Sequence, residues 1–592
     1  MEKFELIAPC HFGMEAVLKR EILDLGYEIT KVEDGKVTFE ADAQGIADAN
    51  IFLRSTERIL LKVAEVKAET FDELFEKTKA LPWENYIPKD GKFWVAKANS
   101  VKSKLFSPSD IQSIMKKAIV ERLKGVYGVS WFEEDGASFP IRVAFMKDVA
   151  TIGIDTSGVS LHKRGYREVS GKAPITETLA ASLIMLTPWN KDRILVDPFC
   201  GSGTTLVQAN ELGIHAIGVD VSIFNTLISN CKIKKYDFKL LERYISVITK
   251  GLDEFDKKNH TSAFEKELLE ELAIYNKEFF PSPEYKAKVQ KKLVDGKKYG
   301  KEKELEFLDK YNNLIKKHKI ELLTSGEDNF INKWFIKHVI NELEFVANEI
   351  EQVELPEIKE ILKIILSRTM RSCRATTHSD LATLKEAVTT TYYCTKHFKI
   401  CKPSFSILKW WRTYSKDTIK RLKQFDSVRT QTNQICLTGD SRSIDIIEKL
   451  NLVDSNFAKD VVTKKINGIF SSPPYVGVID YHEQHAYAYD LFELERKESL
   501  EIGPLYKGQG KAAQQSYVEG IVKVLLNSKK YLIDNYDVFL VANDKYNLYQ
   551  EIAIKAGMKI VNQYKRPVLN RTEKDKNAYA EIIFHLKDKN GE

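Results

Sequence analysis

The sequence predicts an α/β chain in which a region of alternating strands and helices is interrupted by a long helical insertion and preceded by an α+β region. Three observations predict this class. Short apolar strands alternate with amphipathic helices over 192–236 and again over 430–592. A Lys- and Glu-rich stretch of helical period separates those two segments. Strands and helices also alternate through about residue 155.

Composition places the chain among globular proteins of several domains. It has 592 residues, of which 43% are hydrophobic and 29% are charged. The net charge of +6 is small for this length, so a nucleic-acid partner would have to bind a local basic face. No segment is apolar for long enough to cross a membrane, Met1–Cys10 lacks the layout of an export signal, and the seven cysteines are odd in number. We therefore expect a cytoplasmic protein with reduced thiols and no membrane partner, while its oligomeric state stays open.

The first region reads as strand, helix and strand, and it ends in a hairpin within IRVAFMKDVATIGIDT. Five lysines gather around one connection and one helix of this region: Lys97, Lys102, Lys104, Lys116 and Lys117. They are either phosphate ligands or a solvated face, and the charge pattern alone does not decide between the two.

The α/β region opens with strand RILVD, a glycine-rich loop, helix TLVQANELG and strand HAIGVD, which form a βαβ unit. The helical insertion follows over about 237–430. Near its end, Trp410 and Trp411 favour either a surface for single-stranded bases or core packing. The α/β pattern then resumes with QICLTGD, INGIFSSPPY and YDVFLVAND, and its last two strands can pair at a sheet edge.

Three aspartates stand at the ends of successive predicted strands of the α/β region: Asp197, Asp220 and Asp440. Ligands of an open parallel sheet bind outside the carboxyl ends of its strands. The loop after Asp197 turns through Gly201 and Gly203 into a helix whose free N–H groups suit a carboxylate. Asp220 comes 23 positions later and suits a ribose diol, and Asp440 could accept the exocyclic amine of an adenine. Each aspartate alone could be a helix cap, but together they indicate a cofactor that joins a nucleoside to an amino acid.

The motif SSPPY follows the strand at 466–470 and contains Ser472, Pro473, Pro474 and Tyr475. Two prolines hold the chain extended and remove two N–H donors, so carbonyl oxygens and a side-chain oxygen face one point that accepts an amino group. Hydrogen bonds from a base amine to Ser472 and a proline carbonyl would free the nitrogen lone pair to attack an electrophilic methyl group, and Tyr475 could stack on the base. A base inside a duplex has to flip out to reach this point. The alternative interpretation is a rigid loop after a strand.

The motifs DPFCGSGTT, IGVD, LTGD and SSPPY resemble those of the DNA amino-methyltransferases, which modify cytosine N4 or adenine N6 with S-adenosylmethionine. The resemblance covers 192–236 and 430–592 and implies a class I Rossmann-like methyltransferase domain. It implies that the glycine loop holds the methionine part of the cofactor, that Asp220 holds the ribose and Asp440 the adenine, and that SSPPY holds the target amine. The implied cofactor-binding residues are Thr176, Glu177, Asp197, Phe199, Gly201, Ser202, Gly203, Thr204, Asp220 and Asp440.

Residues 1–195 resemble instead the N-terminal half of bacterial 23S ribosomal RNA guanine-N2 methyltransferases, which carry a ferredoxin-like piece and a THUMP RNA-binding domain. The segments LHKRGYR, APITETLAASLI and DPFCGSGT carry this resemblance. After Gly203 and Thr204 the chain departs from that family, whose loop is Asn-Pro-Pro-Tyr and in which we recognise no counterpart of the insertion. A fusion at the shared cofactor loop would account for both resemblances.

The sequence therefore predicts an S-adenosylmethionine-dependent methyltransferase of an exocyclic base amine, with DNA cytosine N4 or adenine N6 favoured as the target. Two alternatives stay open: a THUMP-guided RNA methyltransferase acting on guanine N2 of ribosomal RNA, and a catalytically inactive nucleic-acid-binding protein. Methyl transfer to DNA and to ribosomal RNA in parallel would separate all three.

We expect five parts: a ferredoxin-like piece at 1–45, a THUMP-like module at 46–158, the first part of the methyltransferase domain at 159–236, a helical target-recognition module at 237–430, and the second part of the methyltransferase domain at 431–592. His482 and His485 are expected to support the SSPPY loop rather than to act as bases. No metal site is expected, because the spacings of Cys373, His378, Cys394, His397 and Cys401 do not contain a C-x₂-C framework.

Overall fold

The computed structural model describes residues 3–590 except 12, 159, 162–176, 188–192, 259–260, 323–328, 379–383, 385 and 569–578. The chain forms two compact units. Unit 1 comprises Met1–Arg164, Ile175–Trp189 and Asn562–His585, and unit 2 comprises Gly165–Pro174, Asn190–Val561 and Leu586–Glu592. Each unit is described below by itself.

Unit 1 contains a seven-stranded sheet with the strand order β2-β3-β1-β4-β7-β6-β5. Only the β5 and β6 pair is parallel; the other neighbours are antiparallel, including the predicted hairpin of β6 and β7. The strands are β1 Phe4–Pro9, β2 Glu28–Glu33, β3 Lys36–Ala41, β4 Leu60–Lys67, β5 Lys92–Val101, β6 Ser138–Met146 and β7 Val149–Asp155. The helices are α1 Glu15–Asp24, α2 Ala43–Phe52, α3 Phe71–Lys79, α4 Pro108–Tyr127 and α5 Glu177–Leu186.

Helix α4 shows how the sequence determines the ends of a helix in this unit and the side of it that is buried. Proline occupies its first turn, where no N–H partner is lost, and Gly128 ends it in the left-handed conformation at φ +62°. Its buried side chains recur at helical spacing, and Ile111, Met115, Ile119 and Leu123 pack in an apolar core of this unit. Lys116 and Lys117 lie on the exposed face of the same helix.

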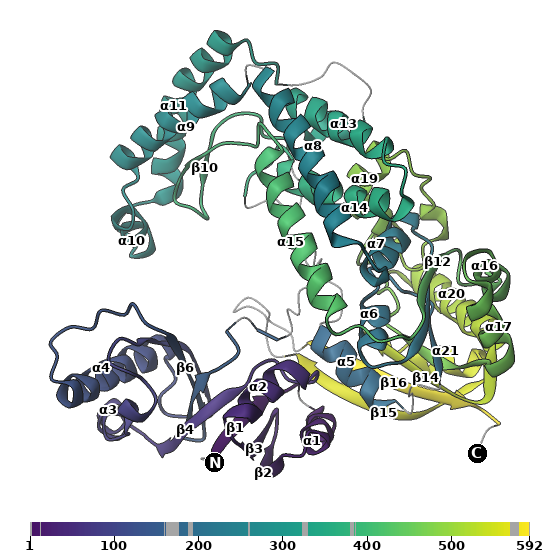
Figure 1. The fold of residues 1–592 in the computed structure, drawn as a ribbon, viewed down its shortest axis with the longest axis horizontal. Coiled ribbons are helices and arrows are strands. Elements are labelled where there is room, and N and C mark those ends of the chain that lie inside the picture. Colours follow the sequence, from purple (N-terminus) through teal and green to yellow (C-terminus); the bar gives the residue numbers. More distant parts are fainter. Residues whose placement is uncertain are drawn as a thin grey trace. The chain divides into compact units, whose positions relative to one another are not determined.

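A second seven-stranded sheet has the order β12-β9-β8-β13-β14-β16-β15, and its strands from β12 to β14 belong to unit 2. Figure 1 labels β12, β14, β15 and β16 of this sheet. The strands from β12 to β14 are parallel, and β15 lies at the edge beside β16, as the sequence predicts. The strands are β8 Ile194–Asp197, β9 His215–Asp220, β12 Gln434–Thr438, β13 Ile466–Ser471, β14 Leu532–Ala542, β15 Met558–Val568 and β16 Tyr579–Asp588. The strand next to β8 on one side is β13, which follows the whole insertion in sequence.

Helices accompany this sheet as the βαβ pattern requires. They are α6 Thr204–Glu211, α7 Ile223–Ile233, α16 Ile446–Val453, α17 Ser455–Lys464, α18 Tyr481–Gln484, α19 Ala486–Leu491, α20 Lys511–Lys529 and α21 Tyr549–Lys555. All four residues of β8 are buried, which explains why this central strand is an unbroken apolar run ending in one aspartate.

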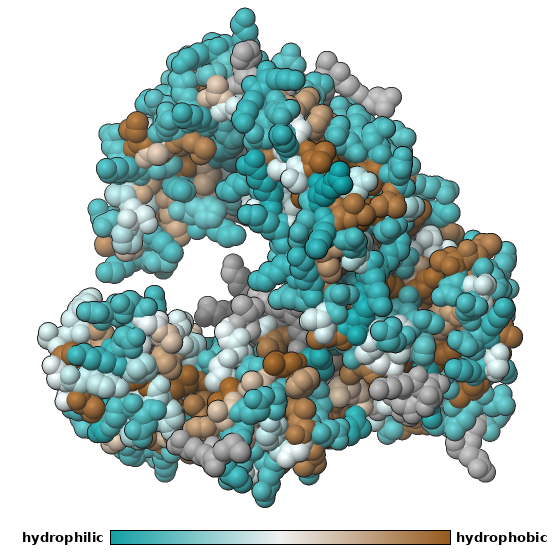
Figure 2. All heavy atoms as spheres, in the orientation of Figure 1, coloured by the Kyte–Doolittle hydropathy of each residue, from teal (hydrophilic) through white to brown (hydrophobic). Residues whose placement is uncertain are grey.

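The insertion is mainly helical and also contains a short hairpin. Its helices are α8 Phe238–Lys258, α9 Thr261–Phe279, α10 Glu284–Gln290, α11 Gly296–His318, α12 Phe330–Trp334, α13 Lys337–Glu351, α14 Pro356–Cys373 and α15 Leu408–Asp426. The hairpin consists of β10 Tyr392–Cys394 and β11 Lys399–Cys401. Hydrophilic side chains cover most of the visible face of these helices (Figure 2).

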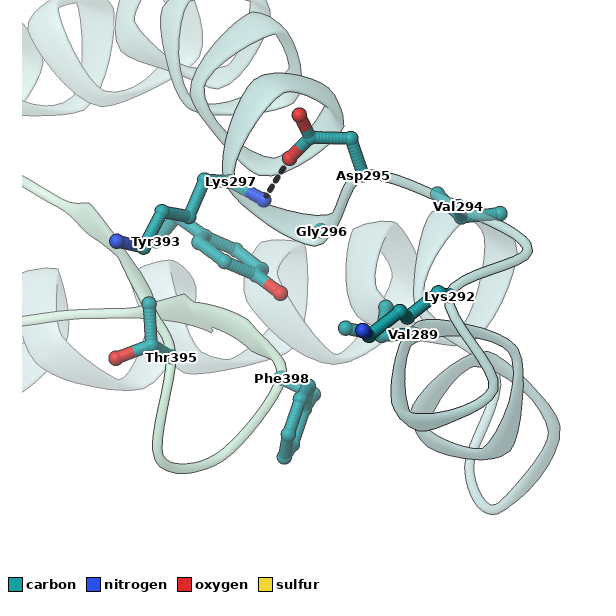
Figure 3. Close-up of a pocket in the computed structure, with 9 residues that line it drawn as sticks. All are labelled: Val289, Lys292, Val294, Asp295, Gly296, Lys297, Tyr393, Thr395 and Phe398. Atoms are coloured by element: carbon teal, nitrogen blue, oxygen red, sulfur yellow. Dashed lines mark hydrogen bonds between the residues drawn. The ribbon is translucent and has the colours of Figure 1, made fainter. Parts of the chain in front are cut away.

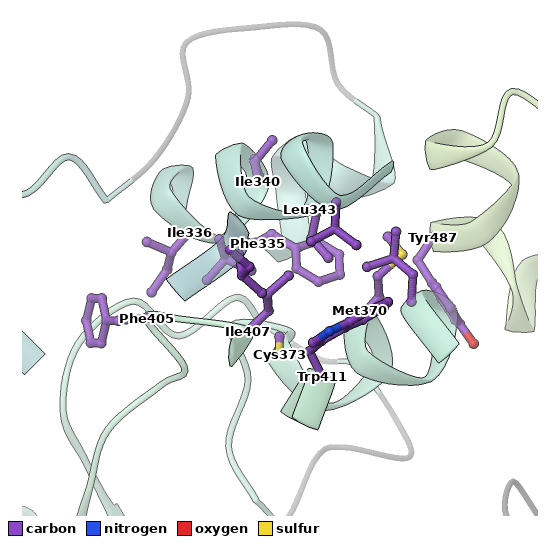
Figure 4. Close-up of a cluster of buried hydrophobic side chains, with 14 of the residues drawn as sticks. Phe335, Ile336, Ile340, Leu343, Met370, Cys373, Phe405, Ile407, Trp411 and Tyr487 are labelled. Carbon is purple, nitrogen blue, oxygen red and sulfur yellow. The ribbon is translucent and has the colours of Figure 1, made fainter. Parts of the chain in front are cut away.

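One apolar core runs through the insertion and into helices α7 and α19 beside the second sheet (Figure 4). It joins Phe335 and Leu343 of the insertion to Phe224 of α7 and Tyr487 of α19. The insertion is therefore an integral part of unit 2 and not a separate module on a linker. It packs against α19, which belongs to the segment that follows the SSPPY loop.

The two tryptophans of α15 differ in environment. Trp411 is fully buried in this core, and its indole nitrogen donates to Thr249 Oγ1 at 2.9 Å. Core packing is thus the correct interpretation for Trp411, whereas Trp410 is only half-buried and stacks on Tyr414. Within the described ranges, no helix combines the length and the apolar character that crossing a bilayer requires.

Candidate active site at the edge of the catalytic sheet

Four predicted functional segments follow four adjacent parallel strands. The strand order β12-β9-β8-β13 puts the segment at Asp440 beside Asp220, Asp220 beside the glycine loop, and the glycine loop beside SSPPY. Because these strands are parallel, their carboxyl ends meet at one edge of the sheet. The sequence predicted this convergence from strand ends that lie far apart in the chain.

Two glycines allow the loop after β8 to turn into α6. Gly201 and Gly203 have φ angles of +53° and +78°, a region that side chains other than glycine rarely adopt. A Cβ at Gly203 would also lie 2.8 Å from the Cβ of Ser229 on α7, so the two helices approach too closely for any side chain there. Lys232 Nζ donates to the carbonyl of Ser202 at 2.6 Å and places a positive charge beside the loop.

Asp220 is held by three donors at the end of β9. Its carboxylate accepts the N–H groups of Gly201 at 2.8 Å and Ser222 at 2.9 Å, and the side-chain amide of Asn225 at 3.2 Å. Burial raises the pKa of Asp220 to about 6, although these hydrogen bonds oppose the shift. A carboxylate offers about four lone-pair positions, so one remains for a hydroxyl of a bound ligand.

Asp197 connects the glycine loop to the strand before SSPPY. Its Oδ1 accepts the hydroxyl of Ser471 at 2.5 Å and the N–H of Phe199 at 3.1 Å. Burial raises the pKa of Asp197, and the hydrogen bonds from these neighbours lower it in part. The sequence motif points to the neighbouring Ser472 and not to Ser471, because only the pairing of β8 with β13 shows which serine faces Asp197.

The carboxylate of Asp440 forms an ion pair with Arg442. Arg442 Nε and Nη2 each approach one of its carboxylate oxygens to 2.8 Å, and Nη2 also donates to the carbonyl of Leu500 at 3.1 Å. An adenine amine would have to share this carboxylate with a bidentate guanidinium. Ser441 beside it donates to the carbonyl of Pro198 at 2.6 Å, which ties this loop to the glycine loop.

Residues 472–475 of the SSPPY motif directly follow β13. Ser472 Oγ donates to the carbonyl of Val541 on β14 at 3.3 Å. A hydroxyl has one hydrogen and two lone pairs, so this bond turns the hydrogen toward β14 and leaves the oxygen lone pairs for an incoming N–H group. Pro473 is buried, and Pro474 and Tyr475 are half-buried.

A second group of polar residues supports this site from α18 and α19. His482 is fully buried and contacts Glu501 through both its N–H and its Nδ1. The Tyr489 hydroxyl lies 2.7 Å from Ser222 Oγ, the residue that caps α7 and donates to Asp220. Burial lowers the pKa of His485 to about 4, so its ring is neutral at pH 7. No local signal in the sequence pairs Glu501 with His482.

Two of the predicted cofactor-binding residues, Thr176 and Glu177, precede β8 and the glycine loop in the chain. Thr176 lies outside the described residues, and Glu177 begins α5 of unit 1.

A pocket of about 440 Å³ lies in the insertion, between the β10–β11 hairpin and the start of α11, and so is not part of the sheet-edge site (Figure 3). Four of the five cysteine and histidine residues for which we expected no metal come together at that hairpin.

Family models match three successive segments of the chain. They describe an RlmL ferredoxin-like domain at 5–60, a THUMP domain at 68–155 and an RMKL-like methyltransferase domain at 164–267. These matches agree with the predicted order of a ferredoxin-like piece, a THUMP module and a Rossmann-like methyltransferase domain.

Curated relatives cover different shares of the chain. The type II methyltransferase M.MjaII of Methanocaldococcus jannaschii is 46% identical over 408 residues, which are 67% of this chain and 76% of that protein. The "Putative RNA methyltransferase YpsC" of Bacillus subtilis is 54% identical over 215 residues, 36% of this chain and 55% of that protein. The ribosomal RNA large subunit methyltransferase K/L of Vibrio cholerae is 34% identical over 234 residues, 39% of this chain and 31% of that protein.

Among solved structures, a "possible methylase" of Clostridium difficile 630 matches over the full length of both chains with a TM-score of 0.48 and 25% identity. The relatedness rests on the M.MjaII comparison, in which this chain covers more than two thirds of a protein 46% identical to it. The chain belongs to that methyltransferase family and is an S-adenosylmethionine-dependent methyltransferase of nucleic acid.

Proposed function

We propose that this enzyme methylates an exocyclic amino group of a nucleic-acid base. The observation that carries the proposal is the hydrogen bond from Ser471 to Asp197, which connects the strand before the amine-accepting loop to the start of the glycine loop. Methyl donor and amine acceptor would then meet at one sheet edge, as direct transfer requires.

The glycine loop and Asp220 fit the cofactor. Backbone N–H groups at the start of α6 suit the carboxylate of its methionine part, and Asp220 retains a lone-pair position for a ribose hydroxyl. We place the adenine near Asp440, with Arg442 as an additional neighbour. S-Adenosylmethionine supplies a methyl group on a positively charged sulfur, which makes that carbon electrophilic.

The SSPPY loop would prepare the amine for attack. Ser472 Oγ and the Pro473 carbonyl accept the two amine hydrogens, which moves the nitrogen toward sp³ geometry and exposes its lone pair. With the cofactor bound, the nitrogen would form a bond to its methyl carbon as the carbon–sulfur bond breaks, and one amine proton would then leave to water. In this proposal the ring of Tyr475 would stack on the flipped base.

The comparisons support an RNA base better than a DNA base. The chain matches a THUMP model and shares 54% identity with a relative whose name specifies RNA. Two aromatic side chains of unit 1 are especially exposed: Phe106 and Trp131 are each 80% exposed. Phe106 follows Lys102 and Lys104 in sequence, and exposed aromatic and basic groups suit the unstacked bases and phosphates of single-stranded RNA. We therefore favour RNA, with guanine N2 as the target amine.

A DNA cytosine-N4 or adenine-N6 target is the second candidate. It is favoured by Ser472, which stands where the guanine-N2 enzymes carry asparagine, and by the 46% identity to a protein named a type II methyltransferase. On either substrate, we propose that the insertion at 237–430 reads the target, because base recognition needs surface beyond the small catalytic sheet.

Methyl transfer from labelled cofactor to ribosomal RNA and to DNA tests both candidates in parallel. Digestion of the labelled product to nucleosides identifies the base, and we expect N2-methylguanosine. Label in N4-methylcytosine or N6-methyladenine of DNA would support the second candidate. Binding of nucleic acid without transfer to either substrate would contradict both and favour the inactive alternative.

A further inference from the structure

Two cysteines and two histidines of the insertion converge although they are separated in sequence. His378, Cys394, His397 and Cys401 each place one potential ligand atom so that all four atoms lie within 4.8 Å of one another. Cys394 ends β10, Cys401 ends β11, and His397 lies in the turn between them. Cys373, the fifth residue of this group in the sequence, is buried in the main core instead.

The separations fit the edges of a metal tetrahedron. Cys394 Sγ lies 3.5 Å and Cys401 Sγ 3.7 Å from the same atom, Nδ1 of His397. Metal bonds of about 2.3 Å to sulfur and about 2.05 Å to nitrogen, at tetrahedral angles, separate the two ligand atoms by about 3.6 Å. The His378 and His397 rings are also adjacent, with centroids 4.5 Å apart.

Hydrogen bonding explains this arrangement less well than a shared ion. A neutral imidazole has one acceptor nitrogen, so Nδ1 of His397 can accept only one well-aligned thiol hydrogen, yet two thiols face it. The ring of His378 is oriented separately, because the Tyr392 hydroxyl lies 2.8 Å from its Nδ1. That contact leaves Nε2 of His378 for an ion, the arrangement in which an outer partner fixes a metal-binding ring.

The backbone of the hairpin also needs stabilisation from outside its own strands. The strands of the hairpin have three residues each, too few to be stable by themselves in water. Phe398 in its turn has φ +54°, a conformation that bulky side chains rarely adopt. An ion bound on both sides of the turn would hold this conformation.

We propose that His378, Cys394, His397 and Cys401 bind one structural Zn²⁺ that fastens the hairpin to the segment after α14. Tetrahedral S₂N₂ coordination favours zinc, and four protein ligands leave no open position for catalysis. The hairpin is also attached to the long helices: Tyr393 N–H donates to Glu304 of α11 at 2.9 Å, and Ile400 N–H donates to Asn276 of α9 at 2.9 Å. The ion would thus connect α14 to α9 and α11 and fix Tyr393, Thr395 and Phe398 at the pocket of Figure 3.

Elemental analysis of the full-length, tag-free chain tests the proposal. We expect one zinc per chain after gel filtration, and none in Cys394→Ser or Cys401→Ser. Lys396→Ala, an exposed neighbour in the same turn, is the matched control and should keep one zinc. Cys373→Ala tests specificity among the cysteines of the insertion and should also keep it.

Two further measurements keep the test decisive if the cysteine variants fail to fold. His397 is exposed, so His397→Ala should fold and lose zinc to a competing chelator at lower chelator concentration than the native chain. Tyr392→Phe should keep the stoichiometry and weaken zinc binding about 10–100-fold. Absence of zinc from the native chain after incubation with zinc sulfate would overturn the proposal. So would equal zinc retention by all variants, or a native mass lower by two hydrogens that maps to a Cys394–Cys401 disulfide.

Discussion

Ser471 Oγ donates to Asp197 Oδ1 at 2.5 Å, and the two residues are 274 positions apart in the sequence. Asp197 ends β8 and Ser471 ends β13, so this bond closes the gap that the insertion opens in the chain. Both side chains are almost completely buried, at 2% and 0% exposure. A buried hydrogen bond to a carboxylate is short and strong, and it fixes the relative position of the loops that follow both strands.

Ser471→Ala should therefore impair both cofactor binding and turnover. The substitution removes the Ser471 hydroxyl from the buried Asp197 carboxylate, and the loss of this hydrogen bond to a charged group should cost about 1.5–3 kcal/mol of unfolding free energy. Thermal unfolding, equilibrium binding of cofactor and single-turnover methyl transfer measure the three effects. Ser427→Ala, which removes a hydroxyl at the exposed end of α15, is the control. Native-like unfolding and turnover in Ser471→Ala would contradict the assigned link.

Ser472→Ala should affect turnover without affecting cofactor affinity. The variant loses the oxygen that we assign to the amine, while the Ser471–Asp197 bond and the glycine loop stay intact. Loss of one preorganised hydrogen-bonding group at a reacting centre commonly lowers the rate about 10²-fold. Tyr475→Ala should act in the same direction by removing the stacking surface. Unchanged single-turnover rates in both variants would remove SSPPY from the mechanism.

Cofactor affinity should fall as the solution becomes more acidic than about pH 6. Burial raises the pKa of Asp220 to about 6, so its carboxylate is ionised at pH 7 and accepts hydrogen bonds. Below this pKa it binds a proton and loses its acceptor capacity, which should raise Kd up to about tenfold per pH unit. Equilibrium dialysis from about pH 8 to pH 5 measures this dependence.

Asp220→Asn is the control for that titration. It should bind the cofactor more weakly at pH 7, and its Kd should not change over the interval in which the native Kd rises. A native Kd that is constant between pH 7 and pH 5 would show that Asp220 does not hold the cofactor.

Much of the catalytic sheet could be predicted from the sequence, because parallel strands that are buried on both faces consist of short runs of apolar residues. Asp197 and Asp220 could be located for the same reason, since each ends such a run. The partners of these residues could not be predicted. Ser471 and Ser472 are adjacent and chemically identical, and only strand register decides that the first faces Asp197.

Elsewhere in the chain, side-chain contacts that depend on the tertiary fold could not be predicted from the sequence. Arg442 is two positions from Asp440, yet its pairing with that carboxylate depends on side-chain direction that composition does not encode. His378 lies 16 positions before Cys394, and the tertiary fold brings the two side chains together. Spacing rules for zinc describe ligands on compact motifs, so they do not recognise ligands that the tertiary fold assembles.

Phe106→Ala should weaken RNA binding if unit 1 provides the RNA surface. Stacking of one base on an aromatic ring contributes about 1–3 kcal/mol, so the loss should be roughly 5- to 150-fold in Kd. Fluorescence anisotropy with a labelled single strand at constant salt measures it, since salt alone changes such affinities strongly. Val126→Ala, an exposed apolar residue at the end of α4, is the control. Equal affinities for Phe106→Ala, Trp131→Ala and the native chain would place the RNA surface elsewhere.

Stability should decrease between neutral and alkaline pH because of His338. Burial lowers the pKa of this histidine, but Glu342 at 3.2 Å and Asp256 at 3.7 Å raise it more, to a net value of about 9. A histidine with a raised folded-state pKa stabilises the fold fully below its unfolded value of about 6.5, and the contribution is lost as the pH rises through 9. The shift corresponds to at most about 3 kcal/mol. Thermal unfolding of the native chain should fall over this interval, whereas His338→Gln should start lower and change less. A His338→Gln curve parallel to the native one would show that the buried Asp256–His338–Glu342 cluster does not carry this charge.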